Sequence, residues 1–371
     1  MLIKVMPDAA SLRVAFWNVE NLFEPGTHPA GPSGKPAARG PQTLDELDAK
    51  LARLAECIGA FFGGQGPDLL GLSEIHTERI VRSLAEALPE QYRFVFEPAL
   101  TPGETGLAVL ARMSAISEMT KLEVFSPTAM ARPRSMIVRC KLARAAEPVL
   151  FVVNHWKSRM VAANTGALTP ERDREQTAEW LGNWLATSEL DTCVIVAGDF
   201  NAEPFESPFS EFRLRGTRHF STATWARATP AYLYNTAWKF LAEPLIAFRV
   251  SNVSGPSGAK RRKTRYSGGG RNYITCAKPN SWGGTKGPEP RPKRTHAAKT
   301  VVWDQLMVSG RALKNGPVTL IEETVDYHRD RRNSRYNARG VLVPIRWDYQ
   351  GPGVATGASD HYPVVAEFAI A

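Results

Sequence analysis

The stretch CVIVAGDFN, residues 193–201, carries the pattern on which the prediction of the fold depends. Its first five residues are apolar and rich in β-branched side chains, which is typical of a buried strand. Gly198-Asp199-Phe200-Asn201 follow directly, and a strand does not need the carboxylate and the amide that they add. Polar groups at the end of a buried strand indicate a site where the sheet gives way to a loop.

The same pattern recurs five times, because further apolar runs finish with a polar or acidic residue. These endings are Trp17-Asn18, Ser73-Glu74, Asn154-His155, Trp303-Asp304 and Ser359-Asp360-His361. If they converge on one edge, carboxylates, amides and two histidines meet there. Such oxygen ligands suit Mg²⁺ or Mn²⁺, and histidines suit proton transfer. The expected chemistry is stabilisation of charge on a phosphoryl oxygen.

The elements expected around these endings alternate between strands and helices. Strands are predicted at 12–18, 68–74, 92–96, 107–111, 136–140, 149–154, 193–197, 301–308 and 364–368. Helices are predicted at 43–62, with Thr43 as N-cap, at 79–88 and at 170–186. Hairpin-like strands mixed with helix-separated strands predict an α/β sandwich with the sheets inside and the helices outside.

The chain reads as one domain spanning residues 1–371, because strand-like runs continue to residue 368 without a break in composition. Within it we expect a Pro/Gly-rich loop at 24–42 and a basic insertion at 255–300. Hydrophobic residues make up 43% and charged residues 22% of the 371, as in soluble globular proteins. The absence of a long apolar run argues against a membrane-embedded body or a membrane partner.

The N-terminus and the cysteines bear on the compartment. The first residues lack an apolar core followed by a cleavage site, so a secretory signal is not expected. The four cysteines are scattered without metal-ligand spacing, and Cys140 and Cys193 lie in apolar runs that predict core positions. A cytoplasmic location suits this cysteine usage.

Positive charge is concentrated in one segment. Residues 255–300 contain twelve Lys or Arg and a single acid, Glu289, whereas the remaining 325 residues carry a net charge of −2 within the total of +9. Such a segment favours a polyanionic partner, and its aromatic residues could stack on unpaired bases. A solvated loop is the alternative interpretation.

The six endings together resemble the endonuclease/exonuclease/phosphatase superfamily, hydrolases with the deoxyribonuclease I-like fold. The resemblance covers residues 12–368, and its most specific pieces are 198–201 and 359–361, supported by 17–22. It implies an α/β fold, a four-layer α-β-β-α sandwich of two mixed sheets packed face to face with helices outside. It also implies a hydrolase that depends on Mg²⁺ or Mn²⁺.

The resemblance implies roles for the metal-binding and water-positioning residues. Asn18 and Glu74 match the first metal ligands, and Asp360 matches a further carboxylate that holds or orients the ion. Asp199 matches the residue that orients or deprotonates the attacking water, with Asn201 steadying the water or the phosphate. Glu74 alone has a simpler explanation as a helix-capping or turn residue, and Asp199 and Asn201 as turn residues, but the recurrence of such residues after six apolar runs favours a site.

The histidines receive roles from the same resemblance. His361 matches the histidine that hydrogen-bonds the scissile phosphate, and Asp304 matches the carboxylate that pairs with it, although a strand-edge acid is the alternative for Asp304. His155 matches the second histidine of the deoxyribonuclease and sphingomyelinase branches. In the deoxyribonuclease branch a glutamate supports that histidine, and Glu104 is the nearest candidate here.

Nucleic acid, preferably DNA, is the expected partner. The residues expected to contact it are Arg132, Lys157, Lys260, Arg261, Arg262, Lys263 and Arg265. The predicted function is a divalent-metal-dependent phosphodiesterase that cleaves DNA. The alternatives are a phosphatase or phosphodiesterase for inositol phosphates, sphingomyelin or a small nucleotide, and a non-catalytic nucleic-acid-binding protein on the same scaffold.

Overall fold

The computed structural model describes most of the chain. The described residues are 11–27, 40–101, 103–127, 132–159, 169–188, 192–210, 212–224, 232–242, 302–336, 342–349, 351 and 355–371. Most of the loop expected at 24–42 and the whole basic segment 255–300 lie outside them, so the expectations for Lys260, Arg261, Arg262, Lys263 and Arg265 do too.

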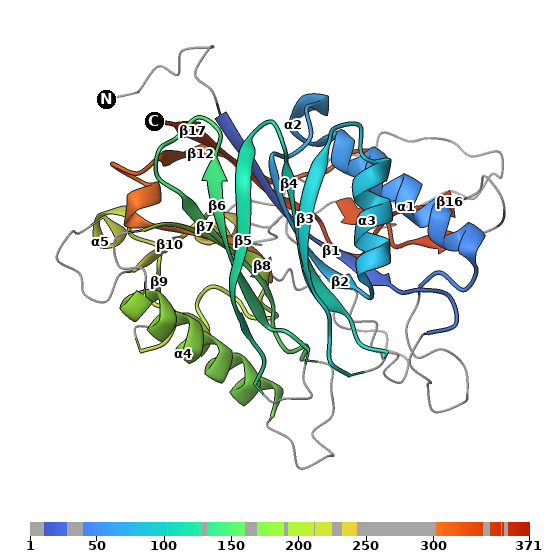
Figure 1. The fold of residues 1–371 in the computed structure, drawn as a ribbon. Helices are drawn as coiled ribbons and strands as arrows, with labels where there is room; N and C mark the ends of the chain where they lie inside the picture. The colour runs from blue at the N-terminus through green and yellow to red at the C-terminus, as the bar shows by residue number, and fades with distance from the viewer. Residues whose placement is uncertain are drawn as a thin grey trace, which may run out of the picture.

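Two mixed sheets stand at the centre of the molecule (Figure 1). The first has the order β12-β17-β1-β2-β4-β3. Its strands are β1 (Ser11–Leu22), β2 (Leu69–Ile75), β3 (Tyr92–Glu97), β4 (Gly106–Arg112), β12 (Val318–Tyr327) and β17 (Val364–Ile370). β1 and β2 are parallel, whereas β17 runs antiparallel to β1, so the two ends of the described chain share one sheet.

The second sheet has the order β5-β6-β7-β8-β11-β10-β9. Its strands are β5 (Ile116–Phe125), β6 (Ser135–Leu142), β7 (Val149–His155), β8 (Cys193–Asp199), β9 (Gly216–Thr217), β10 (Leu233–Asn235) and β11 (Asp304–Ser309). β7 and β8 are parallel, and β11 runs antiparallel to β8. Two small hairpin-like pairs follow: β13 (Ser334–Tyr336) with β14 (Leu342–Pro344), and β15 (Asp348–Tyr349) with β16 (Ala355–Thr356).

Helices cover the outer faces of the sheets. α1 (Leu44–Gly59), α2 (Phe61–Gly64) and α3 (Glu78–Ala87) lie on the side of the first sheet, and α4 (Pro170–Ser188) lies on the side of the second (Figure 1). The short elements are η1 (Ser207–Phe209), α5 (Phe220–Ala223), α6 (Trp238–Ala242) and η2 (Gly310–Ala312). Thr43 is the N-cap of α1 as predicted, because its hydroxyl accepts a hydrogen bond from the Glu46 N–H at 3.2 Å.

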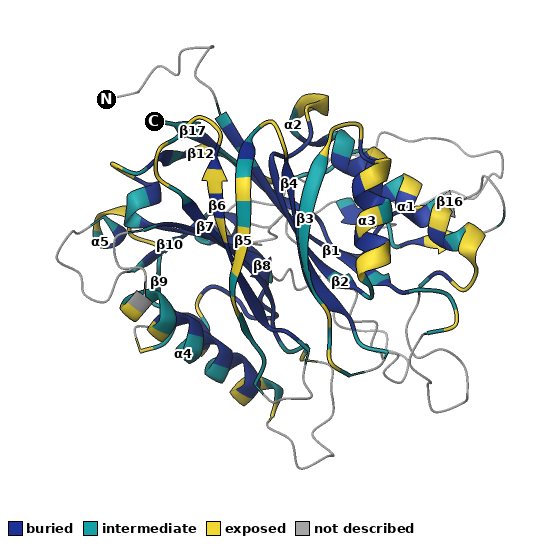
Figure 2. Cartoon of the chain, in the orientation of Figure 1, coloured by how far each residue is buried: buried dark blue, intermediate teal, exposed yellow. Residues whose placement is uncertain are grey.

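Three hydrophobic clusters give the molecule its layers. One lies between the sheets and includes Phe16 and Phe151. The second joins the first sheet to α1 and α3 through Trp17, and the third joins the second sheet to α4 through Trp156. The buried strands between exposed helix faces are visible in Figure 2. The predicted four-layer α-β-β-α sandwich is therefore confirmed.

The structure corrects the predicted strands at the sheet margins. β5 and β12, which the sequence patterns did not predict, are the outermost strands on one side of each sheet, and exposed or half-buried residues interrupt their apolar pattern. The strand predicted at 301–308 begins only at Asp304. Asp304 is therefore the first residue of β11, and the Ser359-Asp360-His361 stretch precedes β17, so the prediction that these residues finish strands was wrong.

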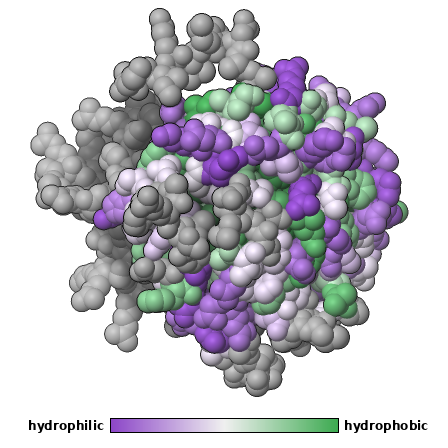
Figure 3. Space-filling model, turned by 60° about the vertical axis from the view of Figure 1, so that its left-hand side comes forward, coloured by the Kyte–Doolittle hydropathy of each residue, from purple (hydrophilic) through white to green (hydrophobic). Residues whose placement is uncertain are grey.

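The described helices, the cysteines and the surface bear on three further expectations from the sequence. None of those helices combines the length and the apolar character needed to cross a membrane. Cys140 and Cys193 are buried free thiols, as predicted. On the face shown in Figure 3, the described side chains mix hydrophilic and hydrophobic areas without one broad apolar patch.

Candidate active site

Strand direction explains why the predicted residues meet at one edge. The carboxyl ends of the parallel pair β7 and β8 place His155 opposite Asp199. Since β11 is antiparallel to β8, its start lies beside the end of β8, and Asp304 is opposite Asp199. The first residue of an antiparallel strand and the last residue of its neighbour can therefore occupy the same edge of the sheet.

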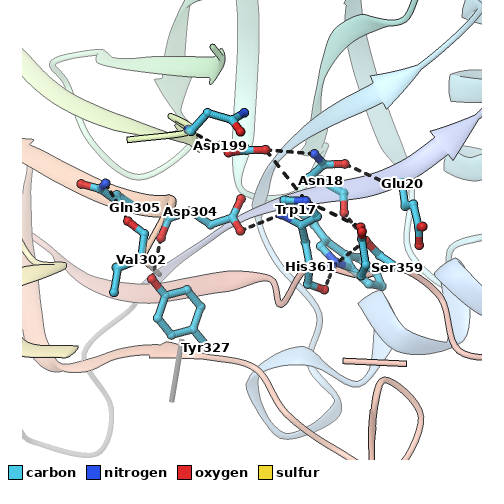
Figure 4. A network of polar contacts seen from close by, with 12 residues as sticks. Trp17, Asn18, Glu20, Asp199, Val302, Asp304, Gln305, Tyr327, Ser359 and His361 are labelled. Carbon is cyan, nitrogen blue, oxygen red and sulfur yellow. Dashed lines mark hydrogen bonds and ion pairs between the residues drawn. The ribbon is translucent and has the colours of Figure 1, made fainter. Parts of the chain in front are cut away.

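Asn18 connects the two sheets at this edge. Its side-chain amide donates to Glu74 Oε1 on β2 at 3.0 Å and to Asp199 Oδ2 on β8 at 3.2 Å. The second oxygen of Glu74 accepts the Asn21 backbone N–H at 2.7 Å. Carboxylates from both sheets thus share one amide, and Figure 4 shows Asn18 directed toward Asp199.

Three hydrogen bonds fix the position of His361. Its Nδ1 lies 2.9 Å from Asp304 Oδ2, and its backbone N–H donates to Ser359 Oγ at 3.0 Å. Ser359 in turn donates to the Asn18 carbonyl at 2.6 Å, and Trp17 Nε1 donates to the His361 carbonyl at 3.0 Å. The ring is therefore fixed with its Nε2 3.9 Å from Asp199 Oδ2 (Figure 4).

His155 and Asn201 flank this cluster. His155 Nε2 lies 3.6 Å from Glu74 Oε1. The Asn201 backbone N–H donates to Asp199 Oδ1 at 3.0 Å, and its side chain donates to the Trp156 carbonyl at 3.1 Å. The structure thus places Asn18, Glu74, His155, Asp199 and His361 together, with Asp304 and Asn201 in direct contact with members of this set.

Strained backbone marks the same edge. Glu20, Asn21, Glu74 and Asn201 have φ between 48° and 66°, in the left-handed region. Asparagine tolerates this region, but glutamate rarely occupies it. Such residues cost about 1–3 kcal/mol each and persist only where surrounding contacts hold them. The hydrogen bonds of Asn18 and Glu74 supply those contacts.

Glu74 and His155 have different charge states at neutral pH. Burial would raise the pKa of Glu74, but the His155 ring and the Asn18 amide outweigh it and lower this pKa to about 2. Burial lowers the pKa of His155 to about 3, despite the nearby Glu74. At neutral pH, a neutral imidazole therefore stands beside an ionised carboxylate.

His361 has the opposite character. Burial alone would lower its pKa, but Asp304, Asp360 and Asp199 raise it to about 10. Burial raises the pKa of Asp304 to about 7 and also raises the pKa of Asp199. The ring of His361 therefore keeps its proton at neutral pH, and Asp199 is a stronger base than an exposed aspartate.

The donor set fits a divalent cation. Among the described residues, potential ligand atoms of Asp199, Asp304 and His361 lie within 4.8 Å of one another, and the two carboxylates can offer oxygen while His361 keeps its proton. Asp304 Oδ1 is buried without a hydrogen-bond partner, so the cluster has unused oxygen capacity. Together with the Glu74 carboxylate, this is the oxygen-rich set that hard cations prefer, whereas the Asn18 oxygen accepts the Glu20 N–H at 3.0 Å.

Asp360 lies at the side of the cluster. Its Oδ1 is 3.6 Å from His361 Nε2, and its Oδ2 pairs with Arg346. Arg346 Nε also lies 2.7 Å from Glu20 Oε1, so the guanidinium bridges two buried carboxylates. Asp360 therefore lies at the predicted position beside the site, but one of its two oxygens already pairs with Arg346.

Sequence reasoning missed Glu20, Arg346 and Lys50. Lys50 is buried and donates to the Glu20 carbonyl. One signal for it existed: Lys50 lies three residues after Leu47 and four before Leu54, on the apolar face of the helix. A lysine at that position indicates a buried partner. No comparable signal marked Arg346.

The remaining predicted contacts lie near His155. Glu104, the candidate to support His155, instead pairs with Arg132. Lys157 is half-buried two residues after His155. Burial lowers the pKa of Lys157, and the nearby Arg134 adds to that effect.

The fold and the site define an α/β sandwich protein with a buried carboxylate–histidine cluster at one edge. The model of the endonuclease/exonuclease/phosphatase family matches residues 13–243 of the sequence. The chain therefore belongs to this family and is a hydrolase acting on phosphoester bonds.

Solved structures share the fold at low sequence identity. An endonuclease/exonuclease/phosphatase family protein from Bacteroides thetaiotaomicron is 15% identical, with a TM-score of 0.50 over 97% of this chain and 95% of that one. A mannosyl-6-phosphatase from the same species is 14% identical, with a TM-score of 0.50 over 96% and 99%. D. rerio TDP2 complexed with a single-strand DNA product is 15% identical, with a TM-score of 0.49 over 97% and 99%. The curated proteins contain no match.

Proposed function

We propose that this protein is a divalent-metal-dependent nuclease that cleaves DNA. The observation that carries the proposal is the hydrogen-bonded contact of Asn18 with Glu74 and Asp199, which joins carboxylates from both sheets beside two histidines. The family includes nucleases and phosphatases, so family membership does not identify the substrate, and features of this chain have to indicate it. The concentration of positive charge in residues 255–300 favours a polyanion over a small soluble ester.

The residues of the site divide the work of hydrolysis. Asp199, held by the Asn201 N–H and the Asn18 amide, orients the attacking water and accepts its proton. His361 keeps its proton, so it binds the phosphoryl oxygen and can supply a proton to the leaving oxygen. Neutral His155 completes the phosphate contacts from the other side of Glu74.

Glu74 and Asp360 would hold the cation, which we propose to be Mg²⁺ or Mn²⁺, and Asn18 would join them through its Oδ1, which in this structure accepts the Glu20 N–H. When bound, the ion offsets the negative charge that develops on the phosphoryl oxygens. Asp304 does not need to be a ligand in this arrangement, because its Oδ2 keeps His361 in place. Asp304 is therefore the positioning residue for the histidine.

One assay tests this function against its alternatives. Supercoiled plasmid, linear duplex DNA, single-stranded DNA and RNA are each incubated with Mg²⁺, Mn²⁺ or a chelator. We expect cleavage of DNA with either metal and none with the chelator. Hydrolysis confined to small phosphate esters would establish the phosphatase alternative, and metal-independent binding without cleavage would establish the non-catalytic one.

A further inference from the structure

Two cations beside His155 lack an anionic partner among the described residues. Lys157 lies two residues after His155, and Arg174 lies near the start of α4. Arg174 Nη1 donates to the Lys157 carbonyl at 2.9 Å, so the two residues are neighbours. The second turn of α4 and the residues just after β7 thus bring two positively charged residues together, one of them two positions from His155.

Arg174 is the more unusual of the two. Only 6% of the residue is exposed, and its Nε is buried without a hydrogen-bond partner. A buried guanidinium without a carboxylate is costly to keep. The adjacent Asp173 does not pair with it, since both Asp173 oxygens accept from Arg134, at 3.1 and 3.3 Å.

Three of the nearby acids are each paired with another arginine, and a fourth, Glu171 in the first turn of α4, is exposed and attracts Arg174. The pairs are Asp173 with Arg134, Glu104 with Arg132, and Glu206 with Arg159. Lys157 and Arg174 are therefore an excess of positive charge. Burial lowers the pKa of Arg174, and the nearby Arg159 adds to this effect, as expected for a cation surrounded by cations.

The position of this excess charge connects it to the hydrolytic site. The His155 backbone N–H donates to the Arg134 carbonyl at 2.9 Å, which ties the end of β7 to the arginine-rich segment. Arg159 Nε donates to the Asn201 carbonyl at 2.8 Å, which ties the same loop to the residues after β8. Backbone contacts therefore connect the Lys157–Arg174 pair to both strands that carry His155 and Asp199.

We propose that Lys157 and Arg174 form a subsite for a second phosphate, namely the backbone phosphate adjacent to the scissile diester of a polynucleotide strand. A guanidinium fork and an ammonium group match phosphate oxygens. A strand carries such a neighbour at every nucleotide, whereas a small ester does not. This proposal rests on the proposed nuclease function. The subsite would make the enzyme prefer a polynucleotide strand over a small phosphate ester.

Stability gives the first test. Because Arg174 is a buried cation without an anionic partner among the described residues, Arg174→Met should not lower the urea midpoint of unfolding, measured with the metal removed. Arg172→Gln is the matched control, two residues earlier on α4, with Glu175 as a partner at 3.3 Å and a half-exposed side chain. A large drop in the midpoint of Arg174→Met alone would show that Arg174 holds the fold and would overturn the subsite.

Activity gives the second test. Two tetranucleotides share one cleavable central diester, flanked by charged phosphorothioates in the first and by neutral methylphosphonates in the second. Arg174→Gln should lower kcat/KM for the charged substrate about 10- to 100-fold more than for the neutral one, the loss of a charged hydrogen bond. Arg172→Gln should leave this ratio at the wild-type value. An equal effect of Arg174→Gln on both substrates would refute the subsite.

Binding separates this proposal from the proposed function. In chelator, fluorescence anisotropy should show weaker binding of the charged tetranucleotide by Arg174→Gln, with a shallower salt dependence than the wild type. If the wild type cleaves neither substrate, the nuclease function is wrong, while a lost charge preference in binding still supports the subsite. If cleavage is normal and binding does not distinguish the substrates, the subsite alone is wrong.

Discussion

His361 shows how a single residue depends on its neighbours at this site. Burial would make the ring neutral, yet three aspartates raise its pKa to about 10. Asp304 contributes most, at 2.9 Å from Nδ1. The neighbouring His155, equally buried but beside one carboxylate, has a pKa near 3. The number of nearby carboxylates therefore decides which histidine carries a proton.

This difference predicts a pH dependence of stability. The pKa of His361 is higher in the folded protein than its ordinary 6.5, so its contribution to stability is complete below pH 6.5 and is lost as the pH rises toward 10. The unfolding free energy of wild type relative to His361→Gln should fall across this window, by at most about 1.4 kcal/mol per pH unit. Urea unfolding in chelator measures it. A difference that does not change with pH would contradict the assignment.

Among the strands, the approach of β7 to β8 sets the geometry of the site. An added Cβ at Gly198 would lie 2.5 Å from both the Cβ and the carbonyl oxygen of Asn154. Asn154 Nδ2 also donates to the Ala197 carbonyl at 3.1 Å, which fixes the two strands side by side. Only glycine at position 198 allows β7 and β8 to approach this closely. The close approach places His155 opposite Asp199.

We therefore expect Gly198→Ala to separate the strands. The overpacking should cost about 1–3 kcal/mol of stability and should reduce catalysis, because Asp199 moves with its strand. Gly59→Ala is the control: it ends α1, and its added Cβ meets only Pro89 at 3.9 Å. Thermal unfolding and diester hydrolysis report the two effects. Full activity in Gly198→Ala would show that this spacing is unimportant.

At the scale of the whole chain, positive charge is concentrated in one stretch of the sequence. Residues 255–300 are strongly basic, whereas the rest of the chain is nearly neutral. Replacing residues 258–290 by a Gly/Ser linker of equal length should abolish plasmid nicking and retain hydrolysis of a small chromogenic diester, because phosphate attraction is lost and the site is kept. Unchanged nicking would exclude a role for this segment in substrate binding.

The sequence predicted the site better than the margins of the sheets. Apolar runs that stop at a polar residue are visible in one chain, so Asp199 and His155 could be found without a structure. The direction of β11 could not, because a residue such as Asp304 has the same local pattern before or after a strand. Arg346 and Arg174 were missed for a different reason: their importance comes from contacts between segments distant in the sequence, which periodicity does not encode.

The central claim is that residues from both sheets act as one catalytic unit. Glu74 belongs to the first sheet and Asp199 to the second, and the Asn18 amide joins them. The most direct test measures kcat/KM for diester hydrolysis in Glu74→Gln, Asp199→Asn and the double variant. We predict a loss of at least about 100-fold in each single variant and little further loss in the double variant. Losses that multiply, or near wild-type activity in either single variant, would contradict a shared centre.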